Sequence, residues 1–244
     1  MKTKTAKGTR DYLPQETELR GFIQSRMLET YLNAGFSQII TPILEDIENL
    51  RNSDGGDNLS MVFEVMKRGS RLSSAITNQQ FDALSDIGLR YELTTSLCRY
   101  YANNKSKLLL PLKCIQIGNC YRAENPQRGR YREFIQCDID IIGLDSFWAE
   151  VELMVTTANA LMSVGMRDFK IRVNDRQLLK ALFLKFGFLE SQVSSLCVIF
   201  DKIDKIGVSG IAHKLAEKLS KIRHANVCWI ISRRRIFRWR SMCK

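Results

Sequence analysis

In the segment from residue 132 to residue 142 (REFIQCDIDII), aliphatic side chains alternate with polar or aromatic ones over most of its length. Successive side chains of a β-strand point to opposite faces, so this alternation predicts a strand with two different faces. The aliphatic face, which we expect to pack on the core, carries Ile135, Cys137, Ile139 and Ile141. The opposite face carries Arg132, Phe134, Gln136, Asp138 and Asp140. A face toward bulk water usually holds mixed small polar residues instead of this set.

These residue types suit a ligand that has a flat base and phosphate groups. Phe134 can stack on a purine, and Arg122 and Arg130 can hold phosphate oxygens through forked hydrogen bonds. Gln136 and Asp140 can recognise polar groups of the same ligand. The competing interpretation is a solvent-exposed hairpin with paired charges, and the pattern alone leaves both open. The sequence has no P-loop motif and no GxGxxG, so a phosphate site here differs from both.

The predicted strand at 132–142 is expected to be the second strand of a β-hairpin. Residues 113–122 form its first strand, and AENPQRGRY (123–131) is a charged loop in which Pro126 and Gly129 provide the turn. Elsewhere the pattern predicts helices at 15–34, at 146–165 and over most of the chain from about 175 to 221, and strands at 36–42, 62–66 and 169–175. Residues 52–58 and 69–88 are predicted loops, the second with one helical turn.

The composition is that of an ordinary globular protein. The chain has 244 residues, of which 45% are hydrophobic and 26% charged, enough for one large core or two modest ones. Seven cysteines without a CxxC pair argue against a disulfide framework and a structural zinc site, and favour a reducing, cytoplasmic location. No apolar run approaches the length of a membrane span, and the N-terminus lacks the apolar stretch of a secretory signal, so we expect no membrane partner.

The net charge of +11 is concentrated at the C-terminus. Residues 222–244 hold seven Lys and Arg and no acidic residue, whereas residues 1–221 hold the other 30 basic residues and all 26 acidic ones. The body of the protein is therefore only mildly basic, and net charge says little about a nucleic-acid partner.

Four segments resemble one family. KGTRDYLP (7–14), ITPILE (40–45), LRYELTT (89–95) and YRAENPQRGRYREFIQCDIDIIG (121–143) are similar to histidyl-tRNA synthetase, a class II aminoacyl-tRNA synthetase. GFSQIITP resembles class II motif 1, and the 121–143 segment resembles motif 2, the strand–loop–strand that holds ATP and the acceptor end of tRNA. The resemblance implies an α+β fold, with a class II synthetase-type antiparallel sheet flanked by helices.

The resemblance also implies roles for matching residues. Arg122 would be the catalytic arginine, which contacts the ATP α-phosphate and the histidine carboxylate. In the ATP site, Glu124 would bond the adenine side, Arg130 would reach the outer phosphates and Phe134 would stack on the adenine. The histidine site would comprise Glu92, Thr94, Arg122, Gln136 and Asp140, with Glu92 and Thr94 holding the amino group. No metal ligand of the chain itself is implied.

The implied function is that of a histidine–tRNA ligase in the cytoplasm. ATP, with Mg²⁺, would activate L-histidine to histidyl-adenylate, which is then transferred to tRNA(His). Such chemistry needs positioning and charge neutralisation rather than a nucleophilic side chain. The helix at 15–34 and the strand ending at Pro42 would form a homodimer interface.

The resemblance ends near residue 220. The family's LVRGLDYY-like segment, motif 3 and anticodon-binding domain have no counterpart in these 244 residues. We therefore predict a partial catalytic domain at 1–221, truncated within the insertion after motif 2, and a disordered Arg/Trp-rich tail at 222–244. For the tail, out-of-frame coding sequence is favoured over binding to RNA or an anionic membrane. ATP–pyrophosphate exchange by this chain is expected to be close to undetectable, and robust turnover would contradict a half-built site.

Two other functions stay open. The first is a non-catalytic relative such as the regulatory subunit of ATP phosphoribosyltransferase, which resembles a synthetase without its anticodon domain and senses histidine. Such a protein is expected to lose residues that face ATP, yet Arg130 and Phe134 are present. The second is a degraded copy without function, which only the tail favours.

Overall fold

The computed structural model describes residues 3–52, 59–173, 175–185, 187–200, 206–207, 209–211 and 213–214. The chain divides into two compact units, Met1–Ile171 and Arg172–Lys244, which are described separately below. The predicted boundary at residue 221, the predicted tail at 222–244 and most of the predicted loop at 52–58 lie outside the described residues.

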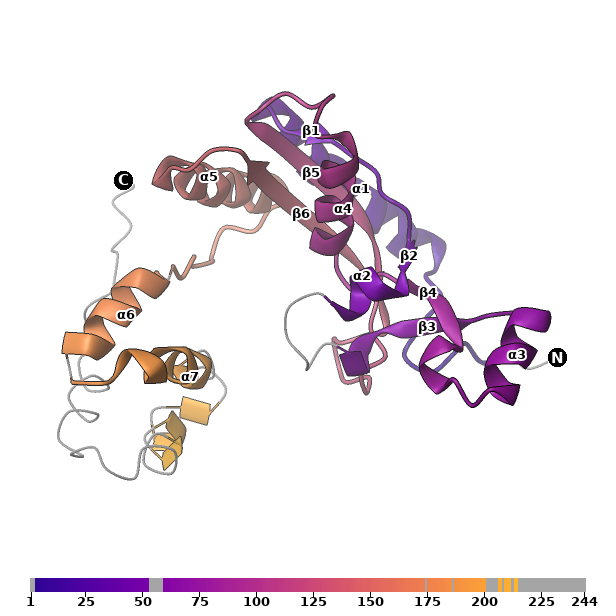
Figure 1. The fold of residues 1–244 in the computed structure, drawn as a ribbon. Coiled ribbons are helices and arrows are strands. Elements are labelled where there is room, and N and C mark those ends of the chain that lie inside the picture. Colours follow the sequence, from indigo (N-terminus) through magenta and orange to yellow (C-terminus); the bar gives the residue numbers. More distant parts are fainter. Residues whose placement is uncertain are drawn as a thin grey trace. The chain divides into compact units, whose positions relative to one another are not determined.

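A long antiparallel hairpin is the frame of the first unit (Figure 1). Strands β5 (Leu112–Tyr121) and β6 (Glu133–Ile142) pair along their whole length, from Leu112 opposite Ile142 to Tyr121 opposite Glu133. A short strand, β1 (Ser37–Gln38), joins β5 in parallel. The predicted hairpin strands are thus confirmed to within one residue, whereas the strand predicted at 36–42 is confirmed for two residues only.

Helices α1 (Pro14–Asn33) and α5 (Phe147–Ser163) cover the aliphatic face of the hairpin, as the alternation predicts. The buried residues of this core are Tyr31, Phe36, Ile115 and Ala160, and the partly buried Ile117, Cys137, Ile139 and Ile141 pack against them. Pro14 is the first residue of α1, a position where its missing N–H costs nothing. The side chain of Ser146 accepts a hydrogen bond from the N–H of Trp148 and so caps the start of α5.

Helix α4 (Thr94–Asn104) lies on the opposite face of the hairpin from α1 (Figure 1). Leu97 of α4 packs with Leu112 and Cys114 of β5. This helix was not predicted. The Glu92 carboxylate accepts hydrogen bonds from the N–H groups of Thr94 and Thr95, at 2.6 and 2.7 Å, and these bonds satisfy donors at the start of α4.

A second sheet has the order β2 (Leu44–Asp46), β4 (Ser85–Leu89) and β3 (Phe63–Met66), all antiparallel. Strand β3 confirms the prediction at 62–66. The short helix α2 (Ile47–Arg51) packs against this sheet, and Ile47, Leu50, Val62 and Tyr91 form its core.

The loop predicted at 69–88 is wrong in two places. Helix α3 (Ser70–Thr77) occupies its first part, and β4 occupies its end as the central strand of the second sheet. The sequence of β4 shows no hydrophobic pattern because the residues at its buried positions, Ser85 and Gly88, are small. A Cβ at Gly88 would lie 2.8 Å from Cδ1 of Leu50, so the packing there excludes a larger side chain.

The second unit contains α6 (Arg176–Lys185) and α7 (Glu190–Phe200), around a core of Phe183, Phe188, Leu196, Ile199 and Ile211. The strand predicted at 169–175 is wrong, because the described residues of this segment belong to no strand. Asp175 instead caps α6, since its carboxylate accepts the N–H of residue 177 at 2.6 Å.

Within the described part of the chain, no single helix has the length and apolar character to cross a membrane. Helices α6 and α7 reach the required length and apolar character only when they are taken together, and the two are bent by 120° relative to one another.

Candidate functional site

The face of the hairpin opposite α1 carries the predicted floor of the site. The register sets Gln136 opposite Gly118, and the next two floor residues of β6, Asp138 and Asp140, opposite Gln116 and Cys114. Because opposite residues of an antiparallel pair point to the same side, these residues of β5 lie beside the polar residues of β6, and the Arg90 guanidinium fills the space over Gly118. Gln136, Asp138 and Asp140 are all partly buried.

Two further predicted residues, Glu92 and Thr94, lie at the start of α4. Glu92 is held in place by the N-terminal N–H groups of α4 and by the hydroxyl of Thr95. Its charge acts on both Asp138 and Asp140, so three carboxylates share this region. Thr94 is the first residue of α4, and its side chain is exposed.

Arg122, the predicted catalytic residue, lies just beyond the end of β5. Its Nε donates to the carbonyl oxygen of Tyr91 at 3.1 Å, which links the hairpin to the segment that carries Glu92. The guanidinium carbon lies 5.0 Å from the centre of the Phe134 ring, within the range of a cation–π interaction. The structure thus brings together the cation, the aromatic ring and the carboxylates that the sequence predicted as one site.

The charged loop between the strands is closed by an ion pair. Arg130 donates from Nη1 to the carboxylate of Glu124 at 3.0 Å, so these two predicted ATP-binding residues contact one another. Gly129 has a φ of +77°, a left-handed conformation that favours glycine at this turn. The Arg130 side chain is 60% exposed, so it can leave Glu124 for another anion at little cost.

The guanidinium of Arg132 is occupied by backbone carbonyl oxygens. This residue precedes the first residue of β6 and anchors the base of the loop, because its guanidinium donates to the carbonyl oxygens of Glu124 and Ala123 at 3.0 and 3.3 Å. The backbone N–H of Arg132 also donates to the carbonyl oxygen of Gly8, at 2.7 Å. The carbonyl oxygen of Arg132 still accepts from the N–H of Arg122 at 2.8 Å, so the pairing of the strands reaches this residue. That Arg132 belongs to the ligand-facing row of the strand stays a prediction.

Burial sets the electrostatics of the floor. It raises the pKa of Asp138 and of Asp140, and the negative charge of Glu92 raises the pKa of both further. Arg122 opposes this effect at Asp138. Burial also raises the pKa of Cys114 and of Cys120 to about 11, so both thiols are neutral at pH 7 and neither is an activated nucleophile.

These pKa values predict a pH dependence of stability. An acid whose pKa is higher in the folded than in the unfolded chain binds more protons when folded, so its contribution to stability falls as the pH rises through the folded pKa. Replacing Asp138 with asparagine removes this contribution. We expect the free energy of unfolding of D138N, measured in urea, to improve relative to wild type as the pH rises above about 4, the ordinary pKa of an aspartate.

D145N, which removes a carboxylate at an exposed position, provides the control. A difference between D138N and wild type that is independent of pH would contradict the raised pKa.

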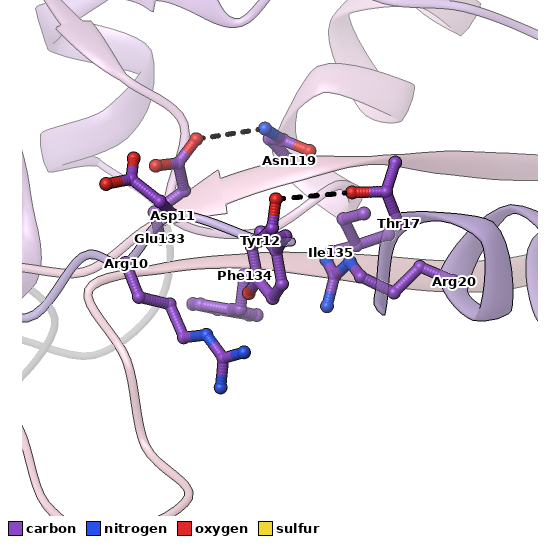
Figure 2. Close-up of a pocket in the computed structure, with 9 residues that line it drawn as sticks. All are labelled: Arg10, Asp11, Tyr12, Thr17, Arg20, Asn119, Glu133, Phe134 and Ile135. Atoms are coloured by element: carbon purple, nitrogen blue, oxygen red, sulfur yellow. Dashed lines mark hydrogen bonds between the residues drawn. The ribbon is translucent and has the colours of Figure 1, made fainter. Parts of the chain in front are cut away.

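A pocket of about 430 Å³ lies at the other side of the hairpin (Figure 2). It is lined by residues 10–12, by Thr17 and Arg20 of α1, and by residues 119 and 133–135 of the hairpin. The guanidinium carbons of Arg10 and Arg20 lie 4.6 and 3.9 Å from the centre of the Tyr12 ring. Of the predicted site residues only Phe134 reaches this pocket, so the pocket and the predicted site are different features.

Comparison with known proteins identifies the family. The sequence model of histidyl-tRNA synthetase matches residues 8–227, which is most of the chain. The chain belongs to the histidyl-tRNA synthetase family. The histidine–tRNA ligase of Leifsonia xyli subsp. xyli is 41% identical over 214 residues, which cover 86% of this chain and 50% of that protein. The probable histidine–tRNA ligase of Tropheryma whipplei is 39% identical over 217 residues, 89% of this chain and 50% of that one.

Solved structures agree with the class II synthetase fold predicted from the sequence. The histidyl-tRNA synthetase of Nostoc sp. PCC 7120 superimposes with a TM-score of 0.78 at 25% identity, over 97% of this chain and 49% of that one. A protein from Bacillus halodurans C, described as an ATP phosphoribosyltransferase regulatory subunit/histidyl-tRNA synthetase, shares the fold with a TM-score of 0.72 at 21% identity, over 95% of this chain and 55% of that one. The chain spans about half the length of the curated relatives it matches.

Two residues of this chain were not assigned a role from the sequence. Asp138 lies in the floor between Gln136 and Asp140, and the alternation that found its neighbours also placed it there. Arg90 is buried beside Gly118 and donates to the carbonyl oxygens of Thr41 and Asn119, both at 2.9 Å. No local pattern shows that a charged residue next to Tyr91 is buried.

Proposed function

We propose that this face of the hairpin binds L-histidine, and that the chain carries part of the activating site of a histidine–tRNA ligase. The observation that supports this best is the grouping of Glu92, Gln136, Asp138 and Asp140 near Arg122. Histidine presents an ammonium group and an imidazole with N–H donors, which match carboxylate and amide acceptors. Its carboxylate matches the guanidinium of Arg122.

ATP is proposed to bind beside the histidine. Phe134 offers a ring for the adenine, and the loop that carries Glu124 and Arg130 offers an acceptor for the adenine side and a cation for the outer phosphates. Mg²⁺ would enter with ATP and neutralise phosphate charge. Among the described residues, no group of three or more Asp, Glu, His or Cys is arranged to hold a metal, so we assign no ligand of the chain to it.

The proposed reaction has two steps. A carboxylate oxygen of histidine attacks the α-phosphorus of ATP, the bond to the β-phosphate oxygen breaks, and pyrophosphate leaves. A hydroxyl of the 3′-terminal ribose of tRNA(His) then attacks the carbonyl carbon of the adenylate and releases AMP. Arg122 would hold the α-phosphate and the carboxylate in line, and the work of the site is positioning and charge neutralisation. A cytoplasmic location fits this function.

ATP binding separates this function from the second candidate, a histidine sensor related to the regulatory subunit, which the fold shared with the Bacillus halodurans protein favours. We expect calorimetry to detect binding of ATP with Mg²⁺. Replacing Arg130 with alanine should weaken this binding by about tenfold or more, because a charge-assisted contact with phosphate is lost.

Arg128 is the matched control, since it is an exposed arginine of the same loop, and R128A should bind ATP like the wild type. A chain that binds histidine but not ATP would support the sensor instead.

A homodimer is also proposed, through the exposed face of α1. Leu19 and Phe22 of α1 are 58% and 54% exposed, and Ile40, after β1, is 84% exposed. Apolar side chains grouped at a surface usually mark an interface. Light scattering should give a particle of about twice the 28.1 kDa of one chain. A particle with the mass of one chain at micromolar concentration would contradict the dimer.

A further inference from the structure

In the side-chain amide of Gln136, the NH₂ group is hydrogen-bonded and the carbonyl oxygen is not. Its Nε2 donates to both carboxylate oxygens of Asp138, at 3.3 and 3.1 Å. Its Oε1 is buried and has no hydrogen-bond partner within the described chain. A buried carbonyl oxygen without a donor is unfavourable, so this atom marks a position where a ligand N–H is expected.

Asp138 determines which end of the amide is free. An ionised carboxylate is only an acceptor, so the NH₂ group of Gln136 must face it and the oxygen must point away. Other neighbours leave this orientation unopposed. Gly118, opposite Gln136, has no side chain, and the Arg90 guanidinium that fills the space beside it offers only N–H groups, which favour a carbonyl oxygen over an NH₂ group. The amide of Gln116, opposite Asp138, is occupied, because it accepts from the Thr41 hydroxyl at 3.0 Å and donates to the Leu93 carbonyl at 3.3 Å.

We propose that Asp138 is a positioning residue that fixes the Gln136 amide with its carbonyl oxygen toward the ligand, so that the site selects a ligand N–H donor. This inference rests on the proposed histidine site and adds a residue to it. A ligand that offered only an acceptor at this position would face the Oε1 lone pairs and be rejected.

A simpler role for Asp138 must be distinguished from this one. Asp138 is also a negative charge near Glu92 and Asp140, with Arg122 as the opposing cation, and its field alone attracts an ammonium group. A field acts whether or not Gln136 is present. Positioning requires the Gln136 amide, so the two roles differ in how the variants combine.

The experiment is a double-mutant cycle read by calorimetric titration with L-histidine. Asparagine at position 138 keeps the size of the side chain but offers both a donor and an acceptor, so the Gln136 amide can turn over. We expect D138N and Q136A each to weaken histidine binding by about tenfold or more. The double variant should bind no more weakly than Q136A, because both changes remove the same contact. D145N, at an exposed position, should bind like the wild type.

A D138N effect that keeps its full size in the Q136A background would overturn the proposal, since it would show a field effect. Unchanged affinity of D138N would overturn it as well.

A measurement without ligand keeps this test separate from the proposed function. With ¹⁵N-glutamine labelling, the Gln136 side-chain resonances are identified by their loss in Q136A. In the free protein they should shift in D138N and stay in place in D145N. If they do not respond to D138N, the positioning role is wrong whatever binds. If they respond but the folded wild type binds no histidine, the proposed function fails while the Asp138–Gln136 contact stands.

Discussion

Replacing Gly118 with alanine is expected to destabilise the chain by about 3 kcal/mol, a large part of the stability of an ordinary domain. A Cβ at Gly118 would lie 2.3 Å from Nη2 of Arg90. Arg90 is only 5% exposed, and its guanidinium donates to Thr41 and Asn119 and, at 3.3 Å, to the carbonyl oxygen of Pro42. The side chain can yield only by breaking these bonds, which leaves a buried charge without acceptors.

Urea unfolding of three variants tests this expectation. Gly21 is the control, because a Cβ there meets nothing within 4 Å and alanine should stabilise the exposed helix by up to about 1 kcal/mol. In an R90M background the alanine at position 118 should cost much less, since the opposing guanidinium is gone. Unfolding of G118A at the same urea concentration as wild type would show that Arg90 does not fill the space beside Gly118.

Replacing Arg99 with methionine is expected to cost about 3–5 kcal/mol of unfolding free energy. Glu45 of β2 has a side chain that is 2% exposed, and Arg99 of α4 donates to its two oxygens at 2.6 and 2.8 Å. Methionine keeps much of the length of the side chain but leaves a buried carboxylate unpaired. The same pair ties the second sheet to α4, whose N-terminus holds Glu92, so its loss should also loosen the predicted site.

Chemical unfolding again provides the measurement, with the exposed pair of Arg26 and Glu29 as the control. These side chains lie 2.8 Å apart but are 46% and 59% exposed, so R26M should change stability by less than about 1 kcal/mol. Adding E45Q to R99M should recover part of the loss, because the buried charge is then removed. An effect of R99M as small as that of R26M would mean that the Glu45 charge is not desolvated in the folded chain.

The hairpin could be predicted closely because its alternation runs through eight consecutive residues of β6, from Phe134 to Ile141, and because its two faces differ in chemistry. This register also fixed the row of Phe134, Gln136, Asp138 and Asp140. Strand β4 could not be predicted, since its buried residues, Ser85 and Gly88, carry no hydrophobic signal. Helix α4 was missed because its start depends on a carboxylate, that of Glu92, outside the helix.

Tertiary contacts explain the rest of what the sequence did not predict. The burial of Arg90 depends on acceptors from Thr41 and Asn119, which are far apart in the sequence. The contact between Glu124 and Arg130 depends on how the loop closes. Residue types named five members of the candidate site (Arg122, Arg130, Phe134, Gln136 and Asp140), and the resemblance added Glu92, Thr94 and Glu124 together with the proposed roles. Neither indicated that Gln136 would have an unpartnered oxygen.

Calorimetric titration of L-histidine into the 244-residue chain tests the central claim most directly. We predict a single site per chain that discriminates against amino acids without an imidazole and that is strongly weakened by D140N. The exposed D145N variant should leave the affinity unchanged. Circular dichroism of each variant would verify that the fold is retained. Absence of histidine binding by the folded wild type, or binding that D140N and Q136A leave untouched, would contradict a histidine site on this face of the hairpin.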